Sequence, residues 1–210
     1  MENLIDILKS LNRKERYWLI KNTTGDSIDE LDAAFITKLN KNLDNKFPKI
    51  PSNASVFFDY QLDWIIAAIS IYSDNLAQTA EIPIPKDIDF NLLDIDMLIV
   101  WEDNKYYMIF AEAKFDTGWK NKQLDDKIKK IKQIEKIFTQ KGIPSRCILL
   151  ILSRKKPEHI SDENLKYIKA WLPLDHSQLK KFTRSKDRKR NKEGLSIIFS
   201  IIEGTKKETQ

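Results

Sequence analysis

Cysteine, histidine and glycine are scarce in this 210-residue sequence, which has one Cys, two His and five Gly. The single cysteine, Cys147, excludes an intramolecular disulfide, and it cannot form a Cys/His zinc site with only two histidines. Any metal site must therefore use oxygen ligands. The sequence also lacks a run of about 18 apolar residues and an apolar signal segment near its start. We therefore expect a cytoplasmic protein with no membrane partner.

The composition is that of an ordinary folded domain. Hydrophobic residues make up 41% of the chain and charged residues 32%, which excludes a disordered polymer. The net charge of +5 is a small excess on a highly charged surface and does not by itself establish a nucleic-acid partner. We predict a helical extension over residues 1–50 and one compact domain over residues 51–210.

Helical spacing dominates the first part of the chain. Apolar residues favour a helix over 2–10 and a second helix that Asn12 can cap and that runs through about Lys21 before Gly25 stops it. Ser27 opens a third helix. The nearly continuous apolar stretch 57–72 predicts a deeply packed helix. Two aspartates in that stretch, Asp59 and Asp63, are four residues apart and would share one helical face.

Strand patterns begin after residue 85. Apolar and aromatic residues fill 90–102 and 105–115, and the Asp103-Asn104 pair between them is typical of a turn, so we predict a β-hairpin. A short strand over Glu81–Pro85 is a further candidate.

The remaining segments alternate between helix and strand. An apolar stripe predicts a helix over 120–140, which ends at Gly142, and a short apolar run predicts a buried strand over 146–153. We then expect a helix from Ser161 to about Trp171 and a strand over 195–202. This order predicts an α/β fold with helices around a mixed sheet.

Charged residues interrupt the two hairpin strands near one end. Glu112 and Lys114 are two residues apart and share one face of their strand, and Asp94 and Asp96 share a face of the partner strand. The turn brings these positions together, where burial requires pairing or coordination. Carboxylates without His or Cys suit a hard cation such as Mg²⁺ or Mn²⁺. A neighbouring lysine can then stabilise charge on a phosphate in the transition state.

These residues resemble the PD-(D/E)XK nuclease superfamily, the restriction-endonuclease-like proteins. The family motif, an Asp on one strand and (D/E)-x-K on the next, is matched by Asp96 and by Glu112-Ala113-Lys114, while Ile95 stands in place of the motif's proline. The resemblance covers about half of the chain, residues 57–153. It implies an αβββαβ core with a mixed central sheet flanked by helices.

The resemblance also implies roles for individual residues. Asp96 and Glu112 would bind Mg²⁺ or Mn²⁺, the carbonyl of Ala113 would add an oxygen, and Lys114 would be the catalytic lysine. An acidic residue on the preceding helix would be a further ligand, for which Asp63 or Asp59 is available. Gln123 on the following helix, and Lys127 four residues later on the same polar side, would contact phosphate or the attacking water. Asp94 has two interpretations, a solvated residue at the strand entrance or a second metal ligand.

The function implied is a magnesium-dependent nuclease that hydrolyses phosphodiester bonds in DNA. Defence, mobile-element biology and repair in prokaryotes are the implied settings, and a homodimer is an expectation by analogy only. RNA stays open as a substrate. The alternative function is a non-catalytic module that binds nucleic acid or protein on the same scaffold, with residues 1–45 available to dock on a partner.

A strongly basic segment, KKFTRSKDRKRNK, spans residues 180–192. Two interpretations remain open for it. It is either a solvated loop or a phosphate-binding arm, because a few Lys and Arg contacts supply much of sequence-independent DNA affinity.

Overall fold

The fold is described from a computed structural model of the chain. The described residues are 2–11, 15–25, 29–43, 47–74, 93–114, 121–153, 168–173, 181–184, 189–191, 194–196 and 199–202. The chain divides into two compact units, Met1–Pro173 and Leu174–Gln210.

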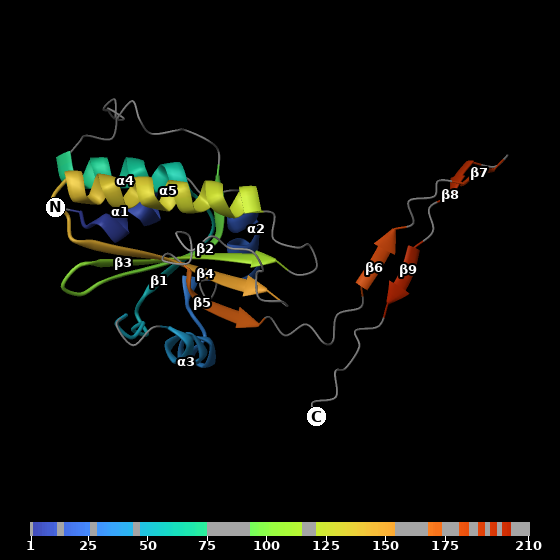
Figure 1. The fold of residues 1–210 in the computed structure, drawn as a ribbon, viewed down its shortest axis with the longest axis horizontal. Coiled ribbons are helices and arrows are strands. Elements are labelled where there is room, and N and C mark those ends of the chain that lie inside the picture. Colours follow the sequence, from blue (N-terminus) through green and yellow to red (C-terminus); the bar gives the residue numbers. More distant parts are fainter. Residues whose placement is uncertain are drawn as a thin grey trace. The chain divides into compact units, whose positions relative to one another are not determined.

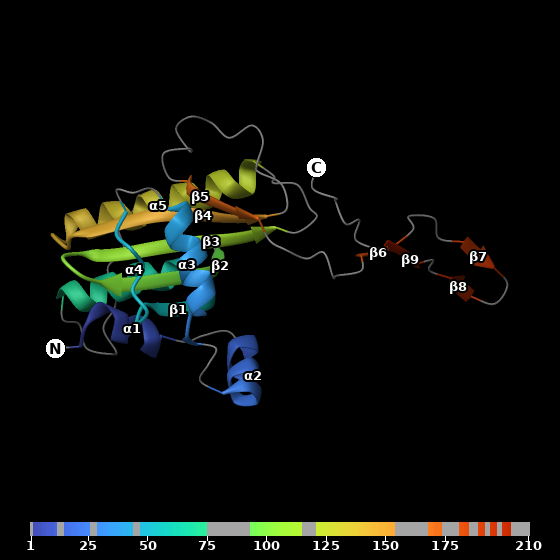
Figure 2. The same cartoon turned by 90° about the horizontal axis from the view of Figure 1, so that it is seen from below.

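The first unit is built on a five-stranded mixed sheet. Its strands are β1 (Ser55–Gln61), β2 (Asp94–Glu102), β3 (Tyr106–Lys114), β4 (Ser145–Ser153) and β5 (Ile168–Pro173). They lie side by side in chain order (Figures 1 and 2). β1, β2 and β3 are antiparallel, whereas β4 and β5 run parallel to β3. The mixed α/β class predicted from the sequence is therefore confirmed.

Helices cover both faces of this sheet. They are α1 (Leu4–Ser10), α2 (Glu15–Thr24), α3 (Ala33–Asn42), α4 (Leu62–Asp74) and α5 (Asn121–Gln140). α4 and α5 lie on one face, and α3 lies on the other (Figure 1). Leu98 and Phe110 belong to the same buried cluster as Ile131 of α5, so even-numbered residues of β2 and β3 face the α4/α5 layer. On the opposite face, the ring of Phe47 contacts Trp101 and Tyr107.

The predicted hairpin and its following helix are confirmed. β2 and β3 pair in register from Met97–Ala111 to Glu102–Tyr106 around the predicted turn. α5 ends at Gln140, and Gly142 just beyond it has a φ of 66°, a conformation that glycine adopts without steric cost. Because β4 is parallel to β3, the chain needs a long crossover, and α5 provides it. Within the described part of the chain, no helix has the length and apolar character required to span a membrane.

The helix predicted over 57–72 is wrong in its first part. Residues Ser55–Gln61 form β1, and α4 begins only at Leu62, whose amide donates to the carbonyl of Leu93. A continuous apolar run does not distinguish a buried strand from a buried helix, and the aromatic residues of this segment favour a strand. Asp59 and Asp63 consequently do not share a helical face.

Two later predictions also change. The helix expected to end near Trp171 is wrong over 168–171, which belongs to β5, and residues 161–167 lie outside the described residues. The single strand expected over 195–202 is replaced by β8 (Gly194–Ser196) and β9 (Phe199–Ile202). The candidate strand Glu81–Pro85 also lies outside the described residues.

The amino-terminal helices begin later than the sequence suggested. α2 starts at Glu15, and α3 starts at Ala33, where the Asp32 carboxylate accepts a hydrogen bond from the amide of Phe35. Such a cap satisfies an otherwise unpaired amide of the first turn. Asn12 and Ser27, the predicted caps, lie outside the described residues.

The described residues of the second unit form two antiparallel strand pairs. β6 (Lys181–Arg184) pairs with β9, and β7 (Lys189–Asn191) pairs with β8. In chain order, the β7–β8 pair is nested between β6 and β9.

Burial of Cys147 in β4 gives a test of the sheet. Burial, with a smaller contribution from the Glu135 charge, raises the pKa of the Cys147 thiol well above its ordinary value. Because the thiolate is the reactive form, the folded protein should resist iodoacetamide at about pH 8, while the unfolded chain should react. Mass spectrometry of the labelled chain measures this difference. Equal labelling rates with and without denaturant would contradict the placement of Cys147.

Candidate carboxylate and lysine site

The two acids of the motif meet at the end of the hairpin. Met97 is the register partner of Ala111, so the next position brings Asp96 opposite Glu112. Directly opposite residues of an antiparallel pair lie on the same face. Consistent with this, the Ala113 amide donates to Asp96 Oδ2 at 2.6 Å. Asp96 therefore reaches the strand that carries Glu112, on the face covered by α4 and α5.

The sheet is irregular at Asp96 on both of its sides. Toward β3, the paired residues end at Met97–Ala111, and the Asp96 carboxylate accepts the Ala113 amide beyond that point. Toward β1, the pairs Phe58–Met97 and Tyr60–Ile95 flank a skipped position, which leaves Asp59 opposite Asp96. Ladder irregularities of this kind are common beside active sites.

Asp59 produces the irregularity on the β1 side. Its φ of 50° lies in the left-handed region, which aspartate tolerates better than most residues but which interrupts regular strand pairing. The backbone conformation thus places a second aspartate across from Asp96. Asp59 was predicted to lie on a helix, as a candidate metal ligand. It lies on β1 instead.

The main chain at Ala113 completes an oxygen-rich gap between β2 and β3. In an extended strand, the N–H and C=O of one residue point toward the same neighbouring strand. Since the Ala113 amide points to Asp96, the Ala113 carbonyl points toward β2 as well. The carboxylates of Asp96 and Glu112 and the carbonyl of Ala113 are therefore available at this end of the hairpin.

Glu112 is buried and is paired with two lysines. The residue is only 2% exposed. Its Oε1 lies 3.1 Å from Lys114 Nζ, and its Oε2 accepts a hydrogen bond from Lys127 Nζ on α5. Burying a carboxylate without such partners would cost roughly several kcal/mol. The two lysines therefore offset the cost of burying Glu112.

A second buried ion pair lies one helical turn further along α5. Lys130, which is 1% exposed, pairs with the carboxylate of Asp63 in the first turn of α4. The structure thus brings Asp63, one of the predicted metal ligands, to a lysine. Lys127 and Lys130 are three residues apart and reach two carboxylates from neighbouring positions of one helix.

Other predicted residues occupy the surroundings of the site. Gln123 is exposed in the first turn of α5, one turn before Lys127. Asp94 is the register partner of Gln61 on β1 and is partly buried.

Lys127 is predicted on the polar side of its helix, but the structure buries it, and the buried Lys130 was not predicted as a site residue. The helical spacing of the apolar residues could have predicted the burial of Lys127, because this residue lies three positions after Leu124 and four before Ile131, within the buried stripe.

The described residues fit a hard cation held by few protein ligands. No three His, Cys, Asp or Glu side chains among them are close enough to hold a metal ion. Mg²⁺ commonly binds one or two carboxylates and keeps several waters, and this is the donor set that Asp96, Glu112 and the Ala113 carbonyl offer. For such binding, Glu112 would exchange at least one of its lysine partners for the ion.

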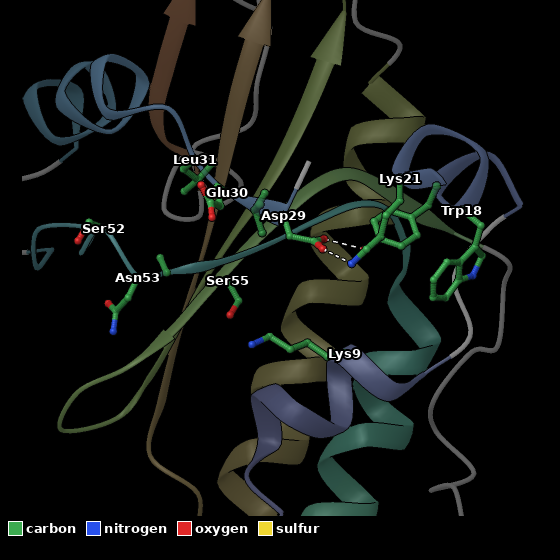
Figure 3. A pocket seen from close by; sticks show the side chains of 12 residues that line it. Lys9, Trp18, Lys21, Asp29, Glu30, Leu31, Ser52, Asn53 and Ser55 are labelled. Atoms are coloured by element: carbon green, nitrogen blue, oxygen red, sulfur yellow. Dashed lines mark hydrogen bonds and ion pairs between the residues drawn. The ribbon is translucent and has the colours of Figure 1, made fainter. Parts of the chain in front are cut away.

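A separate hollow of about 510 Å³ lies beside α2 (Figure 3). Its wall includes Trp18, and Asp29 accepts there from Lys21 Nζ at 2.7 Å. Leu19 and Ile20 on the same helix are exposed as well. No residue of the carboxylate and lysine site lines this hollow.

Comparisons with protein-family models, with curated proteins and with solved structures give no match to this chain.

The Asp63–Lys130 pair gives a test of the buried charges. Lys130→Met should lower the free energy of unfolding by about 3–5 kcal/mol, because it leaves a buried carboxylate unpaired. Adding Asp63→Leu to that variant should restore much of the loss. Urea unfolding of both single variants and the double variant measures the coupling, and Lys122→Met on the exposed side of α5 is the control, expected within about 0.5 kcal/mol of the parent. Strictly additive effects would contradict a direct pair.

Proposed function

We propose that the chain is a magnesium-dependent nuclease of the PD-(D/E)XK type that hydrolyses phosphodiester bonds in DNA. The observation that carries this proposal is the convergence of Asp96, Glu112 and Lys114 on one face at the end of the hairpin. The succession β2, β3, α5 and β4 supports it, because it follows the last four elements of the αβββαβ order implied by the resemblance. β1 precedes α4, however, which departs from that order.

The carboxylates would hold the ion. Asp96 and Glu112 would each supply an oxygen, with the Ala113 carbonyl as a third ligand. When bound, Mg²⁺ supplies positive charge against the negative charge that develops on the phosphate during hydrolysis. The chain's own contribution is to fix these oxygens on two adjacent strands before the substrate arrives, which reduces the reorganisation required during the reaction.

Lys114 would act on the reacting groups. Its side chain is 24% exposed, while that of Glu112 is 3% exposed, so the ammonium lies nearer to solvent than the carboxylate it contacts. From that position it can orient the attacking water and donate to a phosphate oxygen. Water is the nucleophile in this proposal, and no covalent intermediate with the protein forms.

Lys127 would hold Glu112 in place. It contacts the oxygen opposite to the one that Lys114 contacts, so Glu112 Oε2 can stay paired while Oε1 turns to the ion. Lys127 is therefore a positioning residue in this proposal and stays paired with Glu112 when Lys114 engages the substrate.

One observation favours a second function, a nucleic-acid- or protein-binding module without turnover. Both oxygens of Glu112 already have ammonium partners, so the two acids and two lysines balance in charge without a metal ion. Manganese-dependent nicking of a supercoiled plasmid distinguishes the two functions. The nuclease proposal expects nicking that stops on addition of EDTA, and the binding module expects none.

Variants of the motif test the assignment of roles. Lys114→Ala should reduce plasmid nicking by about 10²–10³-fold, because a donor to the transition state is lost, and Glu112→Gln should abolish metal-dependent nicking. The matched controls are Glu102→Gln and Lys105→Ala at the other end of the same hairpin, which should cleave normally. Circular dichroism and urea unfolding must show that each variant is folded. Unaltered cleavage by folded Lys114→Ala and Glu112→Gln proteins would reject the site.

A further inference from the structure

The positive charge of the chain is concentrated in its second compact unit. Residues 174–210 contain 10 Lys+Arg and 5 Asp+Glu, which leaves 26 of each in residues 1–173. The unit that carries the carboxylate and lysine site is therefore neutral, and the small unit has the whole formal charge of +5. A polyanion would be attracted chiefly to the small unit.

The strand register concentrates this charge further. In the pairs Lys181–Ile202 and Arg184–Phe199, a basic residue of β6 lies opposite an apolar residue of β9. Arg190–Leu195 repeats this arrangement in the β7–β8 pair. None of the register pairs described in this unit contains an acidic residue.

We propose that the strand pairs β6–β9 and β7–β8 form a basic β-ribbon that binds duplex DNA through its phosphates. This inference rests on the proposed nuclease function for the choice of DNA. It adds that the DNA is double-stranded and names the surface that binds it. The major groove of B-DNA is about 12 Å wide and accepts a two-stranded β-ribbon. Lys and Arg beside such a ribbon can reach the phosphates that line the groove.

The other nucleic acids fit this ribbon less well. The major groove of A-form RNA is too narrow for side chains to enter. Sequence-independent binding of single strands uses aromatic side chains as stacking platforms, and residues 174–210 contain only two aromatic residues, Phe182 and Phe199. High positive charge with few aromatic residues therefore favours duplex DNA.

Salt-dependent binding to a labelled DNA duplex tests the proposal without cleavage. Fluorescence anisotropy in EDTA, over a series of salt concentrations, gives the affinity and its salt slope for the full chain. The triple variant Arg184→Gln, Lys189→Gln, Arg190→Gln should bind about 100-fold more weakly at about 0.1 M salt, and its log–log salt slope should be shallower by about 2.7. Single-stranded DNA and duplex RNA of the same sequence should bind the parent protein more weakly than duplex DNA.

Two further triple variants keep the result interpretable. Replacing Lys41, Lys49 and Lys122, which are exposed lysines of the first unit, by Gln should leave the log–log salt slope of DNA binding nearly unchanged. Arg184→Lys, Lys189→Arg, Arg190→Lys preserves the charge and should retain duplex binding. Equal losses in the charge-preserving and neutralised ribbon variants would overturn the inference, as would a parent protein that prefers RNA or single strands.

The outcome separates this inference from the nuclease proposal. If the parent protein nicks plasmid while the neutralised ribbon binds DNA like the parent, the ribbon inference fails and the nuclease proposal stands. If ribbon-dependent DNA binding occurs without manganese-dependent nicking, the ribbon inference stands and the nuclease proposal fails.

Discussion

The burial of the Glu112 carboxylate is the constraint on which the rest of this site depends. A charged group at the end of a buried strand requires compensation, and the fold provides it from two directions. Lys114 comes from the same strand two residues later, and Lys127 comes from the helix that crosses over to β4. The helix that makes the parallel connection possible is therefore also the helix that supplies the second lysine partner of this carboxylate.

The same helix connects the site to the rest of the α4/α5 layer. Lys130 pairs with Asp63 at the start of α4, and Lys141, just after α5, lies 2.6 Å from Asp74 at the end of α4. The hydrogen bond from Lys141 lowers the pKa of Asp74. The Asp74 pair is partly exposed and screened by solvent, whereas the Asp63 and Glu112 pairs are buried. Structural ion pairs and the proposed chemistry thus share one helix, and removing a lysine would affect both.

Local patterns predicted the hairpin and its acids, and long-range contacts decided what local patterns could not. The turn at Asp103-Asn104 and the two-residue repeat of strands were sufficient to bring Asp96 close to Glu112. The sequence did not reveal β1, because Ser55–Gln61 runs directly into α4 and both segments are apolar. The sequence also did not reveal that Lys127 and Lys130 are buried. Lysine is ordinarily solvated, and only a partner on another element makes its burial favourable.

The most direct measurement is anomalous diffraction from a crystal grown with Mn²⁺. The account predicts one manganese peak between the carboxylates of Asp96 and Glu112, with the carbonyl of Ala113 among its ligands and Lys127 still in contact with Glu112. A fully ordered hairpin in which both lysines remain on Glu112 and no manganese peak lies near Asp96 would contradict the metal-dependent mechanism.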